Sequence, residues 1–434
     1  MKTVSKLALA ALLTTGIAVT PIAAPAFAQK KKDKNAEPGL KLSPEALKAA
    51  QVAQPAIASK DFATAEPAVA QVEAAAKTDD DKYVAAALRY DLESQKLAAA
   101  QQANPNAPLN ETVLAQPLDA LIANPSTPAA DKGRYAYRRG VLAYNSKQYP
   151  AAIQLFNQSR QLGYNNPDIA LQIVKAKFEA GDAAGGNADL KAEIDRMNAA
   201  GQKAPEEYYR FAISRANQSK NKAETMDWLK RYVSAYPTAK NWRDVIVTYG
   251  LQQNAVATLD NAQKIDLFRL MRAAGAMADQ YDYEEYAQKV YDRGLPAEAQ
   301  AVIKEGQAAG KVPATSSNAR TLLSDSATAI RNEGSLASTE TRAKAGANGT
   351  LAAQTGDAYL GQGNYTKAAE LYRTALTKGG VNADEVNTRL GIALARGGDK
   401  AGATQAFAEV KSAPRADIAG LWSAWLGSSA APAA

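Results

Sequence analysis

The sequence has 434 residues and a formal net charge of +7, and it contains neither cysteine nor histidine. The absence of these residues excludes serine–histidine and cysteine–histidine hydrolysis, imidazole-ligated metals, iron–sulfur clusters and cysteine zinc sites. Any acid–base chemistry would depend on carboxylates, lysine or tyrosine, and a chain of this length can build its core without disulfides.

The first 28 residues have the pattern of a secretory signal peptide. Lys2 and Lys6 precede an apolar stretch at residues 7–19, and residues 26–28 read Ala-Phe-Ala. The apolar stretch is shorter than the roughly 18 residues that a membrane-spanning helix needs, and small residues suit the signal peptidase pocket. We therefore expect cleavage after Ala28 and a periplasmic or secreted protein with no transmembrane segment after cleavage. An uncleaved membrane anchor is the alternative.

The rest of the chain is predicted to be all-α. Good helix formers dominate, and breaks at Pro or Gly, including Pro55 and Pro67, separate helices of roughly 10–18 residues. No run of alternating β-branched residues indicates a strand. The predicted segments are a flexible basic leader at 29–42, a helical N-terminal region at 43–130, a solenoid at 131–310, a linker or two weak helices at 311–348, C-terminal repeats at 349–427 and a disordered tail at 428–434.

Three segments share a spacing of small and aromatic residues. The sets are Gly140, Ala152 and Phe156; Gly356, Ala368 and Tyr372; and Gly391, Ala403 and Phe407. This pattern resembles the tetratricopeptide repeat, whose period is about 34 residues. The resemblance is clearest at 133–166, 349–383 and 384–416, and it is weaker at 168–200.

The resemblance implies an α-solenoid of stacked antiparallel helical hairpins, because neither helix of a repeat buries its apolar face alone. In each hairpin the glycine of the first helix would face the alanine of the second, so that the two helices approach closely. The aromatic residues would fill the space between one repeat and the next.

The same resemblance implies a concave groove, lined by the first helix of each repeat, that holds partner peptides. Groove positions of the family correspond here to Arg134, Tyr137, Val141, Tyr144 and Asn145, and to Glu385, Thr388, Ile392, Ala395 and Arg396. From these we select as partner-binding residues Arg134, Tyr137, Tyr144, Asn145, Thr388 and Arg396. The alternative is that Tyr137 and Tyr144, seven residues apart, form a buried stripe.

Three other clusters have structural interpretations. The adjacent carboxylates at 206–207 and at 284–285 would point about 100° apart on a helix, so neither pair can act as two facing glycosidase carboxyls. Residues 79–81, all Asp, lack the pattern of a calcium loop and are typical of a helix N-terminus. The tyrosines at 281–291 are interpreted as core at helical spacing, with a binding surface as the alternative.

These features predict a non-catalytic protein–protein interaction scaffold of the bacterial cell envelope, with no cofactor and no metal. The expected partner is a protein or peptide. A nucleic-acid partner is not predicted, because much of the excess positive charge lies in the short leader at residues 30–34. Two alternatives stay open: an enzyme subunit associated with glycan or peptidoglycan, and a passive structural spacer.

Overall fold

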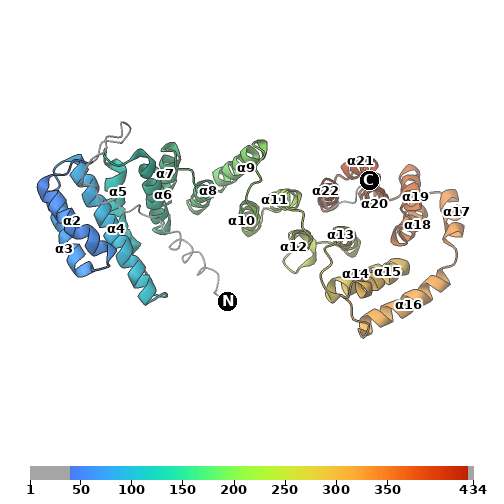
Figure 1. The fold of residues 1–434 in the computed structure, drawn as a ribbon. Coiled ribbons are helices and arrows are strands. Elements are labelled where there is room, and N and C mark those ends of the chain that lie inside the picture. The colour runs from blue at the N-terminus through green and yellow to red at the C-terminus, as the bar shows by residue number, and fades with distance from the viewer. Residues whose placement is uncertain (1–39, 429–434) are drawn as a thin grey trace, which may run out of the picture. The chain divides into compact units, whose positions relative to one another are not determined.

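The structure, a computed structural model, describes residues 40–428, and every regular element in that range is helical (Figure 1). The chain divides between Arg196 and Met197 into two compact parts, called here the N-terminal unit and the C-terminal unit. The predicted signal peptide, most of the basic leader and all but the first residue of the predicted tail lie outside the described residues. No helix within residues 40–428 is long and apolar enough to cross a membrane.

In the N-terminal unit each helix from α2 to α8 packs on its neighbours along the chain. One apolar core joins α2 to α6, and a second joins α6 to α8. The elements are α2 (Pro44–Ala58), α3 (Phe62–Ala75), α4 (Asp79–Ala103), a 3₁₀ turn η1 (Glu111–Leu114), α5 (Ala115–Ala123), α6 (Ala129–Asn145), α7 (Tyr149–Gln161), α8 (Ile169–Glu179) and α9 (Ala183–Ala199), whose last residues pass the unit boundary.

The C-terminal unit is also built from consecutive helices. Its elements are α10 (Glu206–Gln218), α11 (Lys222–Ala235), α12 (Ala239–Ile246), a π-helical turn η2 (Val247–Leu251), α13 (Asn261–Ala273), α14 (Gln280–Asp292), α15 (Pro296–Ala308), α16 (Ser317–Glu333), α17 (Leu336–Ala345), α18 (Thr350–Gly361), α19 (Tyr365–Lys378), α20 (Ala383–Arg396), α21 (Lys400–Ala408) and α22 (Arg415–Leu426). The segment 311–348, predicted to be a linker or two weak helices, contains two helices, α16 and α17.

The start of α4 agrees with the interpretation of residues 79–81 as a helix N-terminus. Thr78 and Asp81 form a capping box, and Asp81 also accepts hydrogen bonds from the backbone N–H groups of Ser43 and Lys77 at 2.8 and 3.2 Å. Burial would raise the pKa of the Asp81 carboxyl, but these donors outweigh burial and lower its pKa to about 2. Asp81 therefore ties the segment that enters α2 to the start of α4.

We expect Asp81→Asn to destabilise the N-terminal unit at pH 7 and to have little effect near pH 2. Because the pKa is lower in the folded state than the usual value of about 4, the carboxylate stabilises the fold fully above pH 4 and this stabilisation is lost as the pH falls through 2. Hydrogen exchange of the Ser43 and Lys77 amides, corrected for intrinsic rates, measures the effect. Equal protection in the variant and the parent at pH 7 would contradict it.

The prediction of helix breaks at Pro55 and Pro67 is wrong, because Pro55 lies inside α2 and Pro67 inside α3. Proline lacks a backbone N–H and crowds the carbonyl four residues earlier, which disfavours a helix interior. Here the two helices pack closely through fully buried alanines, among them Ala53 and Ala65. Tertiary packing therefore overrides the local preference of proline.

Three hairpins, α6–α7, α18–α19 and α20–α21, correspond to the repeats predicted from the sequence. The helix packing inside them needs one correction, because each glycine faces an aromatic ring rather than an alanine. The pairs are Gly140 with Phe156, Gly356 with Tyr372 and Gly391 with Phe407, where a Cβ added to the glycine would lie 2.8, 2.9 and 2.3 Å from the ring. The absence of a side chain thus makes room for the ring of the same hairpin.

The last helix, α22, returns to the beginning of the C-terminal unit. It packs on α20 and α21 and also on α11 and α13 (Figure 1). The Trp422 indole N–H donates to the backbone oxygen of Asp266 at 3.2 Å, and its ring stacks on Phe407 with centroids 6.3 Å apart. Tyr249, in the π-helical turn η2, donates its hydroxyl to Asp417 at 3.1 Å. The last helix of the C-terminal unit therefore packs against helices near the beginning of the same unit.

Candidate functional site

Helix α6 carries the first set of predicted groove residues, and it is packed on two sides. Tyr135 and Leu142 belong to the core formed with α2–α5, whereas Tyr137 belongs to the core formed with α7 and α8. Tyr137 is 9% exposed, and its ring centroid lies 5.7 Å from that of Phe156 and 5.6 Å from that of Tyr164. For Tyr137 the buried-stripe alternative is correct, because its ring is enclosed by its own hairpin and the following segment.

The other three predicted residues of α6 reach the surface to different extents. The Arg134 side chain is 22% exposed and donates to Asp131 at 2.8 Å. Tyr144 is half-buried, and its ring meets Tyr149 edge-on with centroids 5.6 Å apart. Asn145, the last residue of α6, is exposed. Arg134 and Asn145 are 11 positions apart, which corresponds to about 16 Å along a helix.

The second set of predicted groove residues, on α20, faces the interior of the C-terminal unit. Thr388 is fully buried, and its hydroxyl donates to the backbone oxygen of Asp384 at 2.7 Å. The prediction that Thr388 contacts a partner is therefore corrected, because the residue has no surface to offer. Arg396 is half-buried at the end of α20, with its guanidinium 5.7 Å from the centre of the Tyr365 ring.

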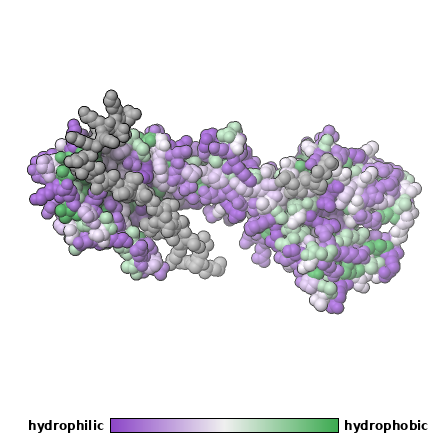
Figure 2. All heavy atoms as spheres, in the orientation of Figure 1, coloured by the Kyte–Doolittle hydropathy of each residue, from purple (hydrophilic) through white to green (hydrophobic). Residues whose placement is uncertain are grey.

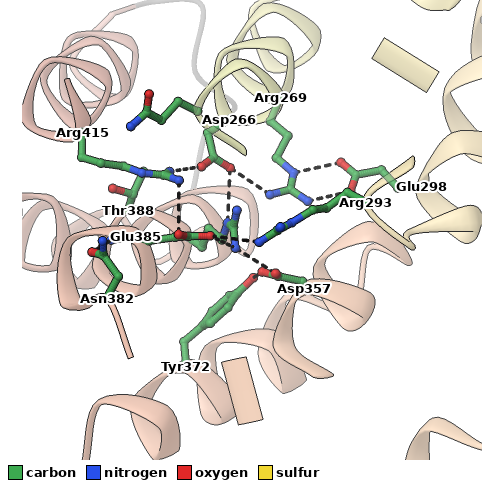
Figure 3. Close-up of polar contacts among 12 residues, drawn as sticks. Asp266, Arg269, Arg293, Glu298, Asp357, Tyr372, Asn382, Glu385, Thr388 and Arg415 are labelled. Atoms are coloured by element: carbon green, nitrogen blue, oxygen red, sulfur yellow. Dashed lines mark hydrogen bonds and ion pairs between the residues drawn. The ribbon is translucent and has the colours of Figure 1, made fainter. Parts of the chain in front are cut away.

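The inward face of α20 is covered by a buried network of charges, drawn in Figure 3. At its centre lies Asp266 of α13, which is fully buried. Its carboxylate accepts a hydrogen bond from Arg269 at 2.9 Å and another from Arg415 of α22, and it lies 3.6 Å from the Nε of Arg389 of α20. A single carboxylate on α13 thus faces three arginines from three helices.

Two further carboxylates extend the network to α15 and α18. Glu298 of α15 accepts two hydrogen bonds from Arg269, at 2.9 and 2.6 Å, and a third from the Tyr286 hydroxyl at 2.5 Å. Asp357 of α18 accepts from Arg389 at 2.8 Å and from the Tyr372 hydroxyl at 2.7 Å. The bidentate geometry and the added hydroxyl donors satisfy most of the buried oxygen atoms.

Glu385 of α20 closes the network on the side nearest the solvent. It lies 2.6 Å from Nη1 of Arg389 and 3.6 Å from Nη2 of Arg415. The half-exposed Arg293 is 3.7 Å away from it. The network therefore joins α13, α15, α18, α20 and α22, and it occupies the place where an open groove was predicted.

Burial and the arginines act in opposite directions on the acids of the network. At Asp266, burial would raise the pKa, but the surrounding arginines lower it below its usual range. At Glu298, Arg269 likewise outweighs burial and lowers the pKa. At Asp357, burial outweighs Arg389 and raises the pKa. Asp266 and Glu298 are therefore ionised, and their pairing with arginines of neighbouring helices holds these helices together.

Sequence reasoning missed this network. Its members lie up to 149 positions apart, and the pairs within one helix, such as Asp266 with Arg269 and Glu385 with Arg389, have the spacing of ordinary surface ion pairs. One signal was available: Asp266 and Arg269 stand in the run IDLFRLM, which is apolar on all sides. A charge in such a run must be buried and therefore needs a partner.

The other predicted clusters also have partners within their own unit. Glu206 accepts hydrogen bonds from the Tyr232 hydroxyl at 2.5 Å and from Arg210 at 2.8 Å. The core interpretation of the tyrosine segment is confirmed for Tyr283 and Tyr286, which are 5% and 0% exposed. Tyr281 of the same segment is 69% exposed.

No protein-family model and no curated protein matches this chain. Among solved structures, the pentatricopeptide repeat protein PPR10 from maize matches with 13% sequence identity and a TM-score of 0.28. The match covers 86% of this chain and 59% of that chain, so this chain spans less than two thirds of the maize protein. The fold is an all-α helical repeat. The geometry of the hairpins themselves establishes this, and the low similarity to the maize protein carries no argument about a ligand.

Proposed function

We propose that the chain is a non-catalytic binding scaffold of the tetratricopeptide kind, and that it holds a segment of a partner protein on α6 of the N-terminal unit. One observation carries the proposal. On α20 Thr388 is fully buried and the half-buried Arg396 lies against the Tyr365 ring, whereas Tyr144 and Asn145 on α6 still reach the solvent. The surface left for a partner is therefore the end of α6.

The chemistry of this surface suits an extended peptide. The Asn145 amide can both donate and accept, so it can pair with peptide backbone groups. Tyr144 offers a large, rigid and half-polar contact. Arg134 is already bonded to Asp131, so an acidic group of the peptide would share this arginine. About five extended residues would span the 16 Å from Arg134 to Asn145.

The proposed place of action is the cell envelope. The pattern of residues 1–28 favours export to the cell envelope, where the scaffold would bind another envelope protein. The helical-repeat fold supports a binding role, because stacked hairpins present extended surfaces.

We expect a photo-crosslinker at Asn145 to trap a discrete protein partner in the periplasm of the native host. A crosslinker at Asn157, an exposed residue on α7, is the matched control. The mass of the chain that has not reacted also reports whether the mature protein begins at Gln29. An adduct from Asn145 alone, reduced by Arg134→Glu, supports the proposal. No adduct from a folded and exported chain would reject it and favour a passive spacer.

A further inference from the structure

Helix α16 departs from the hairpin pattern of the C-terminal unit. It packs on α14 and α15, whereas the next helix, α17, packs on α18 (Figure 1). Gly334, with a φ of +76°, ends α16 and redirects the chain. In a helical repeat, each helix buries its apolar side against the next helix of its hairpin. The side of α16 where such a helix would lie is therefore left without one.

That side carries an apolar strip, defined here as Leu323, Ala327 and Ile330. The spacing of four and three residues places all three on one face of α16. Each is partly exposed, whereas Leu322 and Ala319, on the side toward α15, are buried. Figure 2 shows hydrophobic atoms reaching the surface of the C-terminal unit in the area where Figure 1 draws α15 and α16. The strip thus borders the buried side of α16 and leaves part of its apolar surface exposed.

The strip is bordered by positive charge. Arg320 and Arg331 follow its outer edge and are exposed, and Arg331 bonds only to the Thr328 hydroxyl, at 2.9 Å. Neither arginine forms an ion pair with a carboxylate within residues 40–428. Helix α16 has two acids: Asp325 lies about 200° around the helix from Leu323, whereas Glu333 follows Arg331 by two residues and lies about 60° around the helix from Ile330. The two arginines are therefore available to carboxylates of a partner.

We infer that the strip and its two arginines form a second binding surface, which takes an acidic amphipathic helix from a partner protein. The missing hairpin partner indicates a helix, the strip indicates an apolar stripe on that helix, and the arginines indicate Asp or Glu beside the stripe. This is the helix-in-groove mode of recognition, in which apolar anchors supply affinity and rim charges supply orientation. The inference does not depend on the proposed surface of α6.

The test uses the mature chain and two synthetic helical peptides of about 18 residues, with leucine at every third or fourth position. One peptide has glutamate beside the leucines and the other has lysine, and fluorescence anisotropy reports binding. Arg320→Glu combined with Arg331→Glu is the test variant. Lys222→Glu combined with Lys411→Glu changes the net charge equally at two exposed residues away from α16 and is the control.

We expect the parent chain and the control to bind the glutamate peptide more tightly than the lysine peptide. The test variant should bind the glutamate peptide about tenfold more weakly and should reverse the preference between the peptides. Unchanged unfolding curves would show that the variants are folded. Absence of binding to the parent, or equal weakening in the test variant and the control, would overturn the inference. Equal binding of both peptides by the parent would overturn it as well.

Discussion

Asp266→Asn is expected to destabilise the C-terminal unit by about 3–5 kcal/mol, the usual cost of breaking a buried ion pair. The substitution preserves the shape of the side chain but removes the one negative charge that faces Arg269, Arg389 and Arg415. These arginines are at most 6% exposed, so water cannot replace the lost carboxylate. All four tryptophans of the chain, at positions 228, 242, 422 and 425, belong to this unit. Tryptophan fluorescence during denaturant unfolding therefore reports its stability.

The matched control for Asp266 is Asp244→Asn. Asp244 pairs with Lys240 at 2.6 Å on the surface of α12, and its side chain is 47% exposed. Exposed pairs of this kind contribute little, so the control should change the stability by less than about 1 kcal/mol. Adding Arg415→Gln to Asp266→Asn should recover part of the loss, because a buried cation that has lost its nearest carboxylate is removed. An effect of Asp266→Asn no larger than that of the control would show that the network does not hold the unit together.

Gly391→Ala is expected to lower the stability of the C-terminal unit by about 1–3 kcal/mol, although alanine is the better helix former by about 1 kcal/mol. A Cβ at this position would lie 2.3 Å from the Phe407 ring. The ring cannot easily move away, because it is 4% exposed and stacks on Trp422 of α22. Steric overlap should therefore outweigh the gain in helix propensity. Tryptophan fluorescence during denaturant unfolding measures this change too.

Gly420→Ala provides the control with the opposite expected sign. Gly420 also lies within a helix, α22, but an added Cβ would meet only the flexible end of Lys230, at 3.2 Å or more. We expect this variant to be as stable as the parent or more stable, by up to about 1 kcal/mol. The double variant Gly391→Ala with Phe407→Leu should lose less stability than the two single effects added together. A stabilising effect of Gly391→Ala would contradict the assignment of this glycine to ring packing.

The two predictions show how differently the sequence reports on local and on distant contacts. Gly391 and Phe407 belong to one hairpin, and their spacing recurs in two other hairpins, so periodicity predicted the hairpin, although it paired Gly391 with Ala403 and not with the ring. Asp266 and Arg415 are 149 positions apart, and nothing in their local patterns links them. Some of the residues predicted for the candidate site on α6 do lie at the surface, and one does not. Tyr144 and Asn145 do reach the surface, whereas Tyr137 is enclosed by rings from α7 and from the segment that follows it.

The sequence by itself determined the helical content, the hairpins α6–α7, α18–α19 and α20–α21, and the function of Asp79–Asp81 as a helix start. These features depend on helix propensity, capping and spacing within about 35 residues, which are properties of local sequence. Only the tertiary structure decided that α22 returns to α11 and α13, and that Thr388 is buried instead of lining a groove. The physical reason is that the choice of a distant partner depends on the combined burial of apolar surface and charge, which no local pattern contains.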